Sequence, residues 1–126
     1  MKEAAHTLLV ADDDDSVCDL IKLVFANEGF KVYIAKDGAS ALDKIEKYKP
    51  EVVILDVMMP NLDGYTISYL SKKMKDYNPR VVILTVRNTE FDAAIAERMH
   101  ADAFFTKPVN IDRLVKKVKA LISGEG

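Results

Sequence analysis

The segment "VVILDVMMPNLDGY", from Val52 to Tyr65, begins with four consecutive apolar residues and then reaches a single carboxylate, Asp56. A short run that is apolar at every position is typical of a strand in a parallel sheet with helices on both faces. Packing does not explain Asp56, because another valine would stabilise the end of such a strand better. The segment therefore predicts a central buried strand, Val52–Leu55, that ends in a functional acid.

Four more short strands and five helical patterns alternate along the chain. The other predicted strands are Thr7–Ala11, Lys31–Ala35, Val81–Thr85 and Ala103–Thr106. Apolar residues recur with helical spacing in Val17–Phe25, Ala41–Tyr48, Ile67–Met74, Ala93–Met99 and Ile111–Ile122. This alternation predicts an α/β fold, a doubly wound parallel (βα)5 sheet with right-handed crossovers and helices on both faces.

Length and composition restrict the class of function. The chain has 126 residues, which suits a single domain spanning 1–126. Its net charge of −2 gives no basic surface for nucleic acid or anionic lipid, and no apolar run approaches the roughly 18 residues of a membrane span. Cys18 is the one cysteine, so an internal disulfide is excluded. We therefore expect a cytoplasmic protein that contacts neither nucleic acid nor membrane.

Four consecutive acids, Asp12 to Asp15, follow the first predicted strand. In a doubly wound sheet, ligands bind beyond the carboxyl ends of the strands. If the first and third strands are neighbours, Asp12, Asp13 and Asp56 meet there, and three carboxylates repel one another unless a cation joins them. Such an oxygen-only site predicts Mg²⁺, with Mn²⁺ as the alternative ion. Asp14 and Asp15 are interpreted as solvated acids in the first turn of the next helix.

Two further strand ends supply polar groups to the same edge of the sheet. The fourth predicted strand ends in the hydroxyl of Thr85, and the fifth is followed by the ammonium of Lys107. Carboxylates, a metal, a hydroxyl and an ammonium at one edge can together hold a phosphoryl group. Asp56, the single acid centred at its strand end, is the best candidate for a carboxylate nucleophile that forms an aspartyl phosphate.

These motifs, in this order and spacing, resemble the receiver domain of two-component response regulators, the CheY-like family. The similarity covers residues 8–122 and is carried by the acidic pair after the first strand, Asp56, "MMPNLDG", Thr85 and Lys107–Pro108. The resemblance implies a flavodoxin-like fold with strand order 2-1-3-4-5. It also implies a phosphorelay in which Asp56 accepts a phosphoryl group from a sensor histidine kinase or a phosphotransfer protein.

The resemblance implies a set of metal ligands as well. Mg²⁺ would be held by Asp13, Asp56 and the backbone carbonyl of Met58, with Asp12 acting partly through water. A domain of this kind catalyses its own phosphorylation and dephosphorylation and is not a turnover enzyme.

The resemblance further implies how the signal leaves the domain. Thr85 and Phe104 would form the switch pair, and the bond between Lys107 and Pro108 would be cis. The face made by helix four, strand five and helix five would act on an output domain or a downstream protein. The sequence leaves open whether phosphorylation also produces a homodimer, and whether the chain is a stand-alone regulator or the receiver piece of a longer regulator or hybrid kinase.

Several positions depart from the usual pattern of the family. Val86 follows the switch threonine where a smaller residue is usual, and we expect it to narrow access to Asp56. Phe104 stands where tyrosine is frequent, and His100 replaces a glycine at a position that favours a left-handed backbone. Cys18 replaces a common arginine, which would alter the helix that faces the kinase.

Two variable positions are expected to set the lifetime of the phosphorylated form. Met58, two residues after Asp56, has no polar side chain that could orient an attacking water. Arg87, two residues after Thr85, could reach the phosphoryl group as a cation. Together they predict slow self-hydrolysis.

Three other classes of protein fit the sequence less well. A phosphatase of the haloacid-dehalogenase type would use Asp12, Asp14 and Ser16 as its signature, but the chain lacks the later acidic pair that such an enzyme needs. A calcium EF-hand requires glycine and glutamate where this chain has Val17 and Leu23. A receiver-like interaction domain that is never phosphorylated is disfavoured, because every chemical position is filled.

Overall fold

Strands and helices alternate along the chain in the computed structural model, which describes residues 5–86 and 90–124. The strands are β1 (Thr7–Ala11), β2 (Lys31–Ala35), β3 (Val52–Leu55), β4 (Arg80–Thr85) and β5 (Ala103–Thr106). The helices are α1 (Asp15–Asn27), α2 (Gly38–Tyr48), α3 (Gly64–Lys72), α4 (Glu90–Arg98) and α5 (Ile111–Ser123). The predicted elements are confirmed, apart from shifts of a few residues at their ends. Within these described ranges, no helix is long and apolar enough to cross a membrane.

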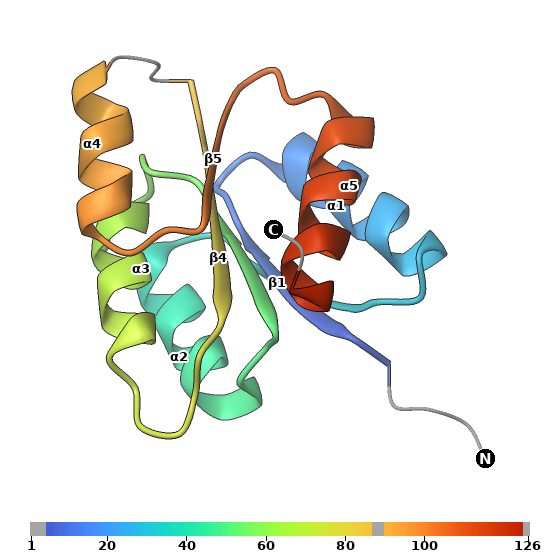
Figure 1. Ribbon diagram of the computed structural model, residues 1–126, viewed down its shortest axis with the longest axis horizontal. Helices are drawn as coiled ribbons and strands as arrows, with labels where there is room; N and C mark the ends of the chain where they lie inside the picture. The colour runs from blue at the N-terminus through green and yellow to red at the C-terminus, as the bar shows by residue number, and fades with distance from the viewer. Residues whose placement is uncertain (1–4, 87–89, 125–126) are drawn as a thin grey trace.

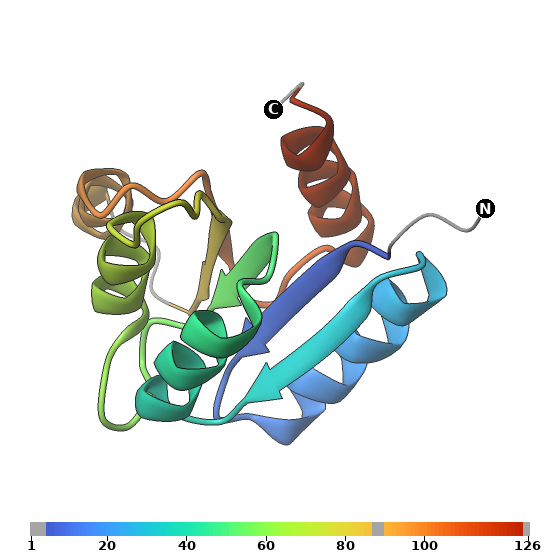
Figure 2. The same ribbon diagram turned by 90° about the horizontal axis from the view of Figure 1, so that it is seen from below.

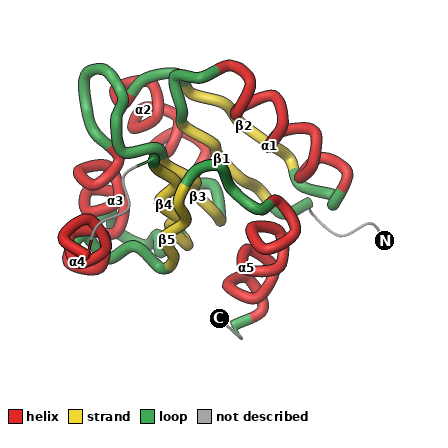
Figure 3. The backbone as a smooth tube through the Cα atoms, turned by 90° about the horizontal axis from the view of Figure 1, so that it is seen from above, coloured by secondary structure: helices red, strands yellow, loops and turns green. Residues whose placement is uncertain are grey.

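The strands form one parallel sheet in the order β2-β1-β3-β4-β5. Helices α1 and α5 cover one face of this sheet, and α2, α3 and α4 cover the other (Figure 1, Figure 2, Figure 3). The prediction of a doubly wound, flavodoxin-like α/β fold with strand order 2-1-3-4-5 is therefore confirmed.

Alternate residues of the strands point into two hydrophobic clusters, one on each face of the sheet. One cluster joins the strands to α1 and α5 through residues such as Phe25 and Leu114. The other joins them to α2 and α3 through residues such as Ile45 and Ile67. Every residue of β3 is fully buried, because helices cover both of its faces. This burial explains why β3 is apolar throughout and why polar side chains appear only after its last residue.

The hydrogen-bonded ladder brings the candidate residues to one edge of the sheet. The Asp56 N–H donates to the carbonyl of Ala11 at 2.9 Å, so Asp56 and Asp12 follow the ends of adjacent strands. Further along the sheet, the Lys107 N–H donates to the carbonyl of Thr85 at 2.8 Å. Backbone pairing alone therefore aligns the ends of β1, β3, β4 and β5 at the carboxyl edge.

The run of four acids divides between the site and the start of α1. Asp14 precedes the helix, and its carboxylate accepts a hydrogen bond from the Ser16 N–H at 2.9 Å. Asp15 lies in the first turn and pairs with Lys36. The interpretation of Asp14 as a first-turn acid is therefore wrong, because this residue is the N-cap that satisfies a free backbone donor.

Candidate functional site

The carboxylates of Asp12, Asp13 and Asp56 lie together in the loops that follow β1 and β3. One oxygen from each residue lies within 4.8 Å of the other two. Asp12 and Asp56 are buried, whereas Asp13 is exposed at the rim. Three carboxylate oxygens this close fit a small divalent cation with a preference for oxygen ligands.

Lys107 reaches across the sheet edge to this acidic cluster. Its Nζ donates to Asp12 Oδ2 at 2.6 Å and lies 3.6 Å from Asp56 Oδ2. Burial lowers the pKa of Lys107, but the hydrogen bond and charge of Asp12, together with the charge of Asp56, outweigh burial and raise it. The ammonium therefore stays charged between the two carboxylates.

The environment of Asp56 disfavours its ionised form. Burial raises the pKa of Asp56, and the negative charge of Asp12 adds to this effect. Lys107 and the Met58 N–H act in the opposite direction without cancelling it. One ammonium is thus not enough to neutralise three carboxylates, and a divalent cation would relieve the remaining repulsion.

Thr85 and Phe104 lie on neighbouring strands and face the same side of the sheet. Phe104 pairs with Ile83, two residues before Thr85, and residues two apart in a strand point to the same face. Phe104 is half-buried against the cluster that includes α4 residues, and Thr85 is fully buried. Phe105 packs instead against the opposite cluster. Both members of the predicted switch pair are thus on the α4 side.

The side chain of Met58 stands at the entrance to the acidic cluster. It is 60% exposed and lines a hollow of about 490 Å³ that Asp13 and Tyr65 also line. Val86 lies beyond the end of β4, and its side chain is 66% exposed. Arg87, to which the sequence assigns a role in the lifetime of the phosphorylated form, lies outside the described residues.

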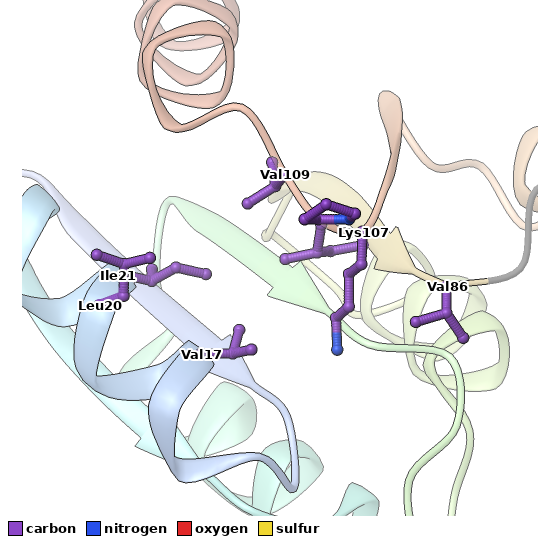
Figure 4. Close-up of a pocket in the computed structure, with 8 residues that line it drawn as sticks. Val17, Leu20, Ile21, Val86, Lys107 and Val109 are labelled. Carbon is purple, nitrogen blue, oxygen red and sulfur yellow. The ribbon is translucent and has the colours of Figure 1, made fainter.

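An apolar groove that the sequence analysis did not predict runs beside the site. It has a volume of about 350 Å³ and separates α1 from the segment after β5 (Figure 4). Its lining residues are Val17, Leu20, Ile21, Leu84, Val86, Lys107, Pro108 and Val109. Leu20 belongs to the apolar face of α1 yet remains 45% exposed, so the apolar periodicity of the sequence contains no signal of this groove.

Three further expectations concern single positions in the loops and in α1. The Lys107–Pro108 bond is cis, and His100 has a left-handed backbone with φ of 67°, as expected. Cys18 points into the core, where its Sγ donates to the carbonyl of Asp12 at 3.3 Å and burial raises the pKa of the thiol. Cys18 therefore belongs to the core beneath α1, and its expected effect on the helix that faces the kinase stays a prediction.

The geometry agrees with comparisons of the chain with known proteins. The family model for the response regulator receiver domain matches residues 8–119. The receiver domain of Francisella response regulator 1452 is 31% identical, with 96% of this chain and 99% of that chain covered and a TM-score of 0.88. The signal receiver domain of a DNA-binding response regulator from Colwellia psychrerythraea is 29% identical, with 94% of this chain and 98% of that chain covered and a TM-score of 0.86. The BeF3-activated DrrB receiver domain is 25% identical, with 95% of this chain and 99% of that chain covered and a TM-score of 0.84.

The chain belongs to the response regulator receiver domain family. Members of this family act in two-component signalling, and phosphorylation on aspartate and dependence on Mg²⁺ are general properties of the family. The acidic cluster of this chain, with one ammonium inserted between its members, has the chemistry that those two properties require.

Proposed function

We propose that Asp56 of this chain accepts a phosphoryl group from the phosphohistidine of a sensor histidine kinase or a phosphotransfer protein. The observation that carries the proposal is the convergence of the Asp12, Asp13 and Asp56 carboxylates with the ammonium of Lys107. Asp56 is the acid that continues the central strand, and it is buried in the floor of the cluster. The chain is then a phosphoacceptor that promotes its own phosphorylation and dephosphorylation, and not a turnover enzyme.

In the proposed reaction, a carboxylate oxygen of Asp56 attacks the phosphorus atom of the donor. The new bond joins this oxygen to phosphorus, and the bond from phosphorus to the imidazole nitrogen of the donor breaks. The imidazole keeps the electron pair of the broken bond and takes a proton from solvent. Mg²⁺, held by Asp12, Asp13, Asp56 and the backbone carbonyl of Met58, would neutralise charge on the phosphoryl oxygens.

The residues of the other strand ends complete the phosphoryl site. Lys107 already lies 3.6 Å from the Asp56 carboxylate, so its ammonium needs little movement to meet a phosphoryl oxygen there. Doing so would loosen its 2.6 Å hydrogen bond to Asp12. The hydroxyl of Thr85 donates to another phosphoryl oxygen in this proposal, which draws the end of β4 toward Asp56.

The proposed movement of Thr85 toward the phosphoryl group also explains how the signal reaches the α4–β5–α5 face. Phe104 lies on the same side of the sheet as Thr85, so it can follow into the space that Thr85 leaves. Phosphorylation then biases an existing equilibrium between two arrangements of the α4–β5–α5 face. This face acts on an output domain, a downstream protein or a second copy of the chain.

The groove beside α1 suits the approach of the phosphoryl donor. Its lining is mainly apolar, and Lys107 joins it to the acidic cluster. An apolar side chain from a helix of the kinase or phosphotransfer protein can fill the groove while a neighbouring histidine of that helix faces Asp56. We place this encounter in the cytoplasm, with residues 1–126 acting as one receiver domain.

Met58 is expected to lengthen the life of the phosphorylated form. Its exposed thioether cannot orient a water for attack, and the proposal assigns Arg87 a supporting role as a cation near the phosphoryl group. Met58→Asn introduces an amide at the entrance and should accelerate the loss of phosphate by roughly tenfold. The decay rate of the phosphorylated protein, followed by intact mass, tests this, and an unchanged rate would contradict the role of Met58.

The experiment that tests the proposed function is phosphorylation by a small donor. The protein is incubated with acetyl phosphate and Mg²⁺, and intact mass is measured for the wild type and for Asp56→Asn. We expect the wild type to gain one phosphoryl group and the variant to gain none. A gain that persists in Asp56→Asn would show that Asp56 is not the acceptor. A wild type that gains nothing, even from phosphohistidine donors, would overturn the function.

A further inference from the structure

Helix α4 is held to the protein by little apolar packing. Its buried residues are Asp92 and Ala96, and Ile95 packs partly buried against the core, whereas α5 fully buries Leu114 and Val118 and nearly buries Leu121. A short helix with one small buried apolar residue and one partly buried one gains less from the hydrophobic effect than a helix such as α5. Other contacts must therefore contribute to its position, and α3 lies directly beside it (Figure 2).

Two hydroxyl groups of α3 donate hydrogen bonds to α4. The Tyr65 hydroxyl lies 3.2 Å from the backbone carbonyl of Asp92 and 3.4 Å from its carboxylate oxygen Oδ1. The Ser68 hydroxyl donates to the carbonyl of Met99 at 2.8 Å. Asp92 lies in the first turn of α4, and Met99 directly follows its last residue. We call Tyr65, Ser68, Asp92 and Met99 the α3–α4 clamp, because they join both ends of α4 to α3.

The clamp is connected to the acidic cluster through the start of α3. Gly64, the residue before Tyr65, donates its N–H to the carbonyl of Val57 at 3.1 Å and packs against the backbone of Asp56. The Tyr65 side chain lines the same hollow as Asp13 and Met58. A change in the loop after β3 can therefore reach Tyr65 through one residue of backbone, and the hollow that Tyr65 shares with Asp13 and Met58 gives a second route.

We propose that Tyr65 is a positioning residue that couples the acidic pocket to α4 through its hydrogen bond to Asp92. Ser68 holds the far end of α4 at Met99, so that movement of Tyr65 shifts the first turn of α4 more than the last. The coupling rests on the proposed function at Asp56. The stabilisation of α4 by the α3–α4 clamp, which we call the hold on α4, is independent of that function. This route is additional to that through Thr85 and Phe104.

The first arm of the test measures the hold on α4 in the protein without added ligand. Tyr65→Phe keeps the aromatic ring and removes the hydroxyl. Tyr69→Phe is the matched control, because Tyr69 lies on the same helix and its side chain is 40% exposed. Hydrogen–deuterium exchange of amides 90–98 is compared with exchange in β1 and β3, which serve as internal references.

We expect Tyr65→Phe to accelerate exchange in 90–98 by roughly three- to tenfold, with the reference strands and the Tyr69→Phe variant unchanged. Ser68→Ala should accelerate mainly the last turn of α4. If α4 of Tyr65→Phe exchanged at the wild-type rate, Tyr65 would not hold α4 in place. Equal acceleration in the reference strands would also contradict this role, because that pattern reports only general destabilisation.

The second arm measures the coupling, with Mg²⁺ and beryllofluoride as a stable substitute for the phosphoryl group. In the wild type we expect these ligands to change exchange both in the loop 57–63 and in α4. In Tyr65→Phe the loop should respond as in the wild type, and the α4 response should fall to roughly a third or less. A full α4 response in Tyr65→Phe would overturn the coupling. A wild type that does not bind beryllofluoride would overturn the proposed function and the coupling with it, while the first arm would still decide the hold on α4.

Discussion

Replacing Gly64 by alanine is expected to destabilise the protein by about 3 kcal/mol, because the new methyl group has no room. A Cβ at this position would lie 2.3 Å from the carbonyl oxygen of Asp56 and 2.9 Å from its carbonyl carbon. Backbone atoms cannot rotate away as a flexible side chain can. Helix α3 would have to move away from the end of β3, and the free energy of unfolding would fall.

Urea denaturation measures this loss directly, and Gly29→Ala is the matched control. Gly29 has a left-handed backbone with φ of 90°, and a Cβ there would meet nothing within 4 Å. Its replacement should therefore cost only about 1 kcal/mol, from backbone strain alone. Equal losses for Gly64→Ala and Gly29→Ala would contradict the close approach of α3 to Asp56.

Mg²⁺ is expected to raise the melting temperature of the wild type, and Asp13→Asn should remove most of that rise. At a free Mg²⁺ concentration ten times the dissociation constant, preferential binding to the folded state contributes about 1.4 kcal/mol. For a domain of this size, that corresponds to a rise of roughly 5 °C. Asp13→Asn removes a ligand and also one of three repelling charges, so the variant should melt higher than the wild type when Mg²⁺ is removed by a chelator.

Asp14→Asn is the control for the magnesium experiment. It neutralises the adjacent acid, and asparagine caps a helix about as well as aspartate, so α1 should keep its start. This variant should retain the full Mg²⁺ effect. A Mg²⁺ effect that survives in Asp13→Asn would place the metal elsewhere, and one that is lost in Asp14→Asn would indicate a general response to negative charge.

The sequence was sufficient for the sheet and for the residues at its carboxyl edge, for a physical reason. A strand covered on both faces must be apolar throughout, so a carboxylate such as Asp56 directly after it marks the end of the strand and a candidate functional position. Parallel pairing then brings such ends together, whatever the details of packing. The residues of the acidic cluster could therefore be found without knowledge of any side-chain contact.

Features that depend on contacts between helices could not be predicted in this way. Leu20 fits the apolar pattern of α1 but lies partly exposed in the groove between α1 and the segment after β5. The partner of Tyr65 depends on how α4 packs against α3, which hydrophobic periodicity does not encode. The preference of Lys107 for Asp12 over Asp56, at 2.6 Å against 3.6 Å, depends on side-chain reach across three strands.

The most direct test of the central claim is to locate the phosphoryl group in the chain. After phosphorylation with acetyl phosphate and Mg²⁺, borohydride reduces an aspartyl phosphate to homoserine, and peptide mass spectrometry identifies the altered residue. We predict homoserine at position 56 and at no other aspartate. Homoserine at position 12, the first residue of the phosphatase-type signature, would contradict Asp56 as the acceptor. So would unaltered aspartates in a protein that has gained phosphate.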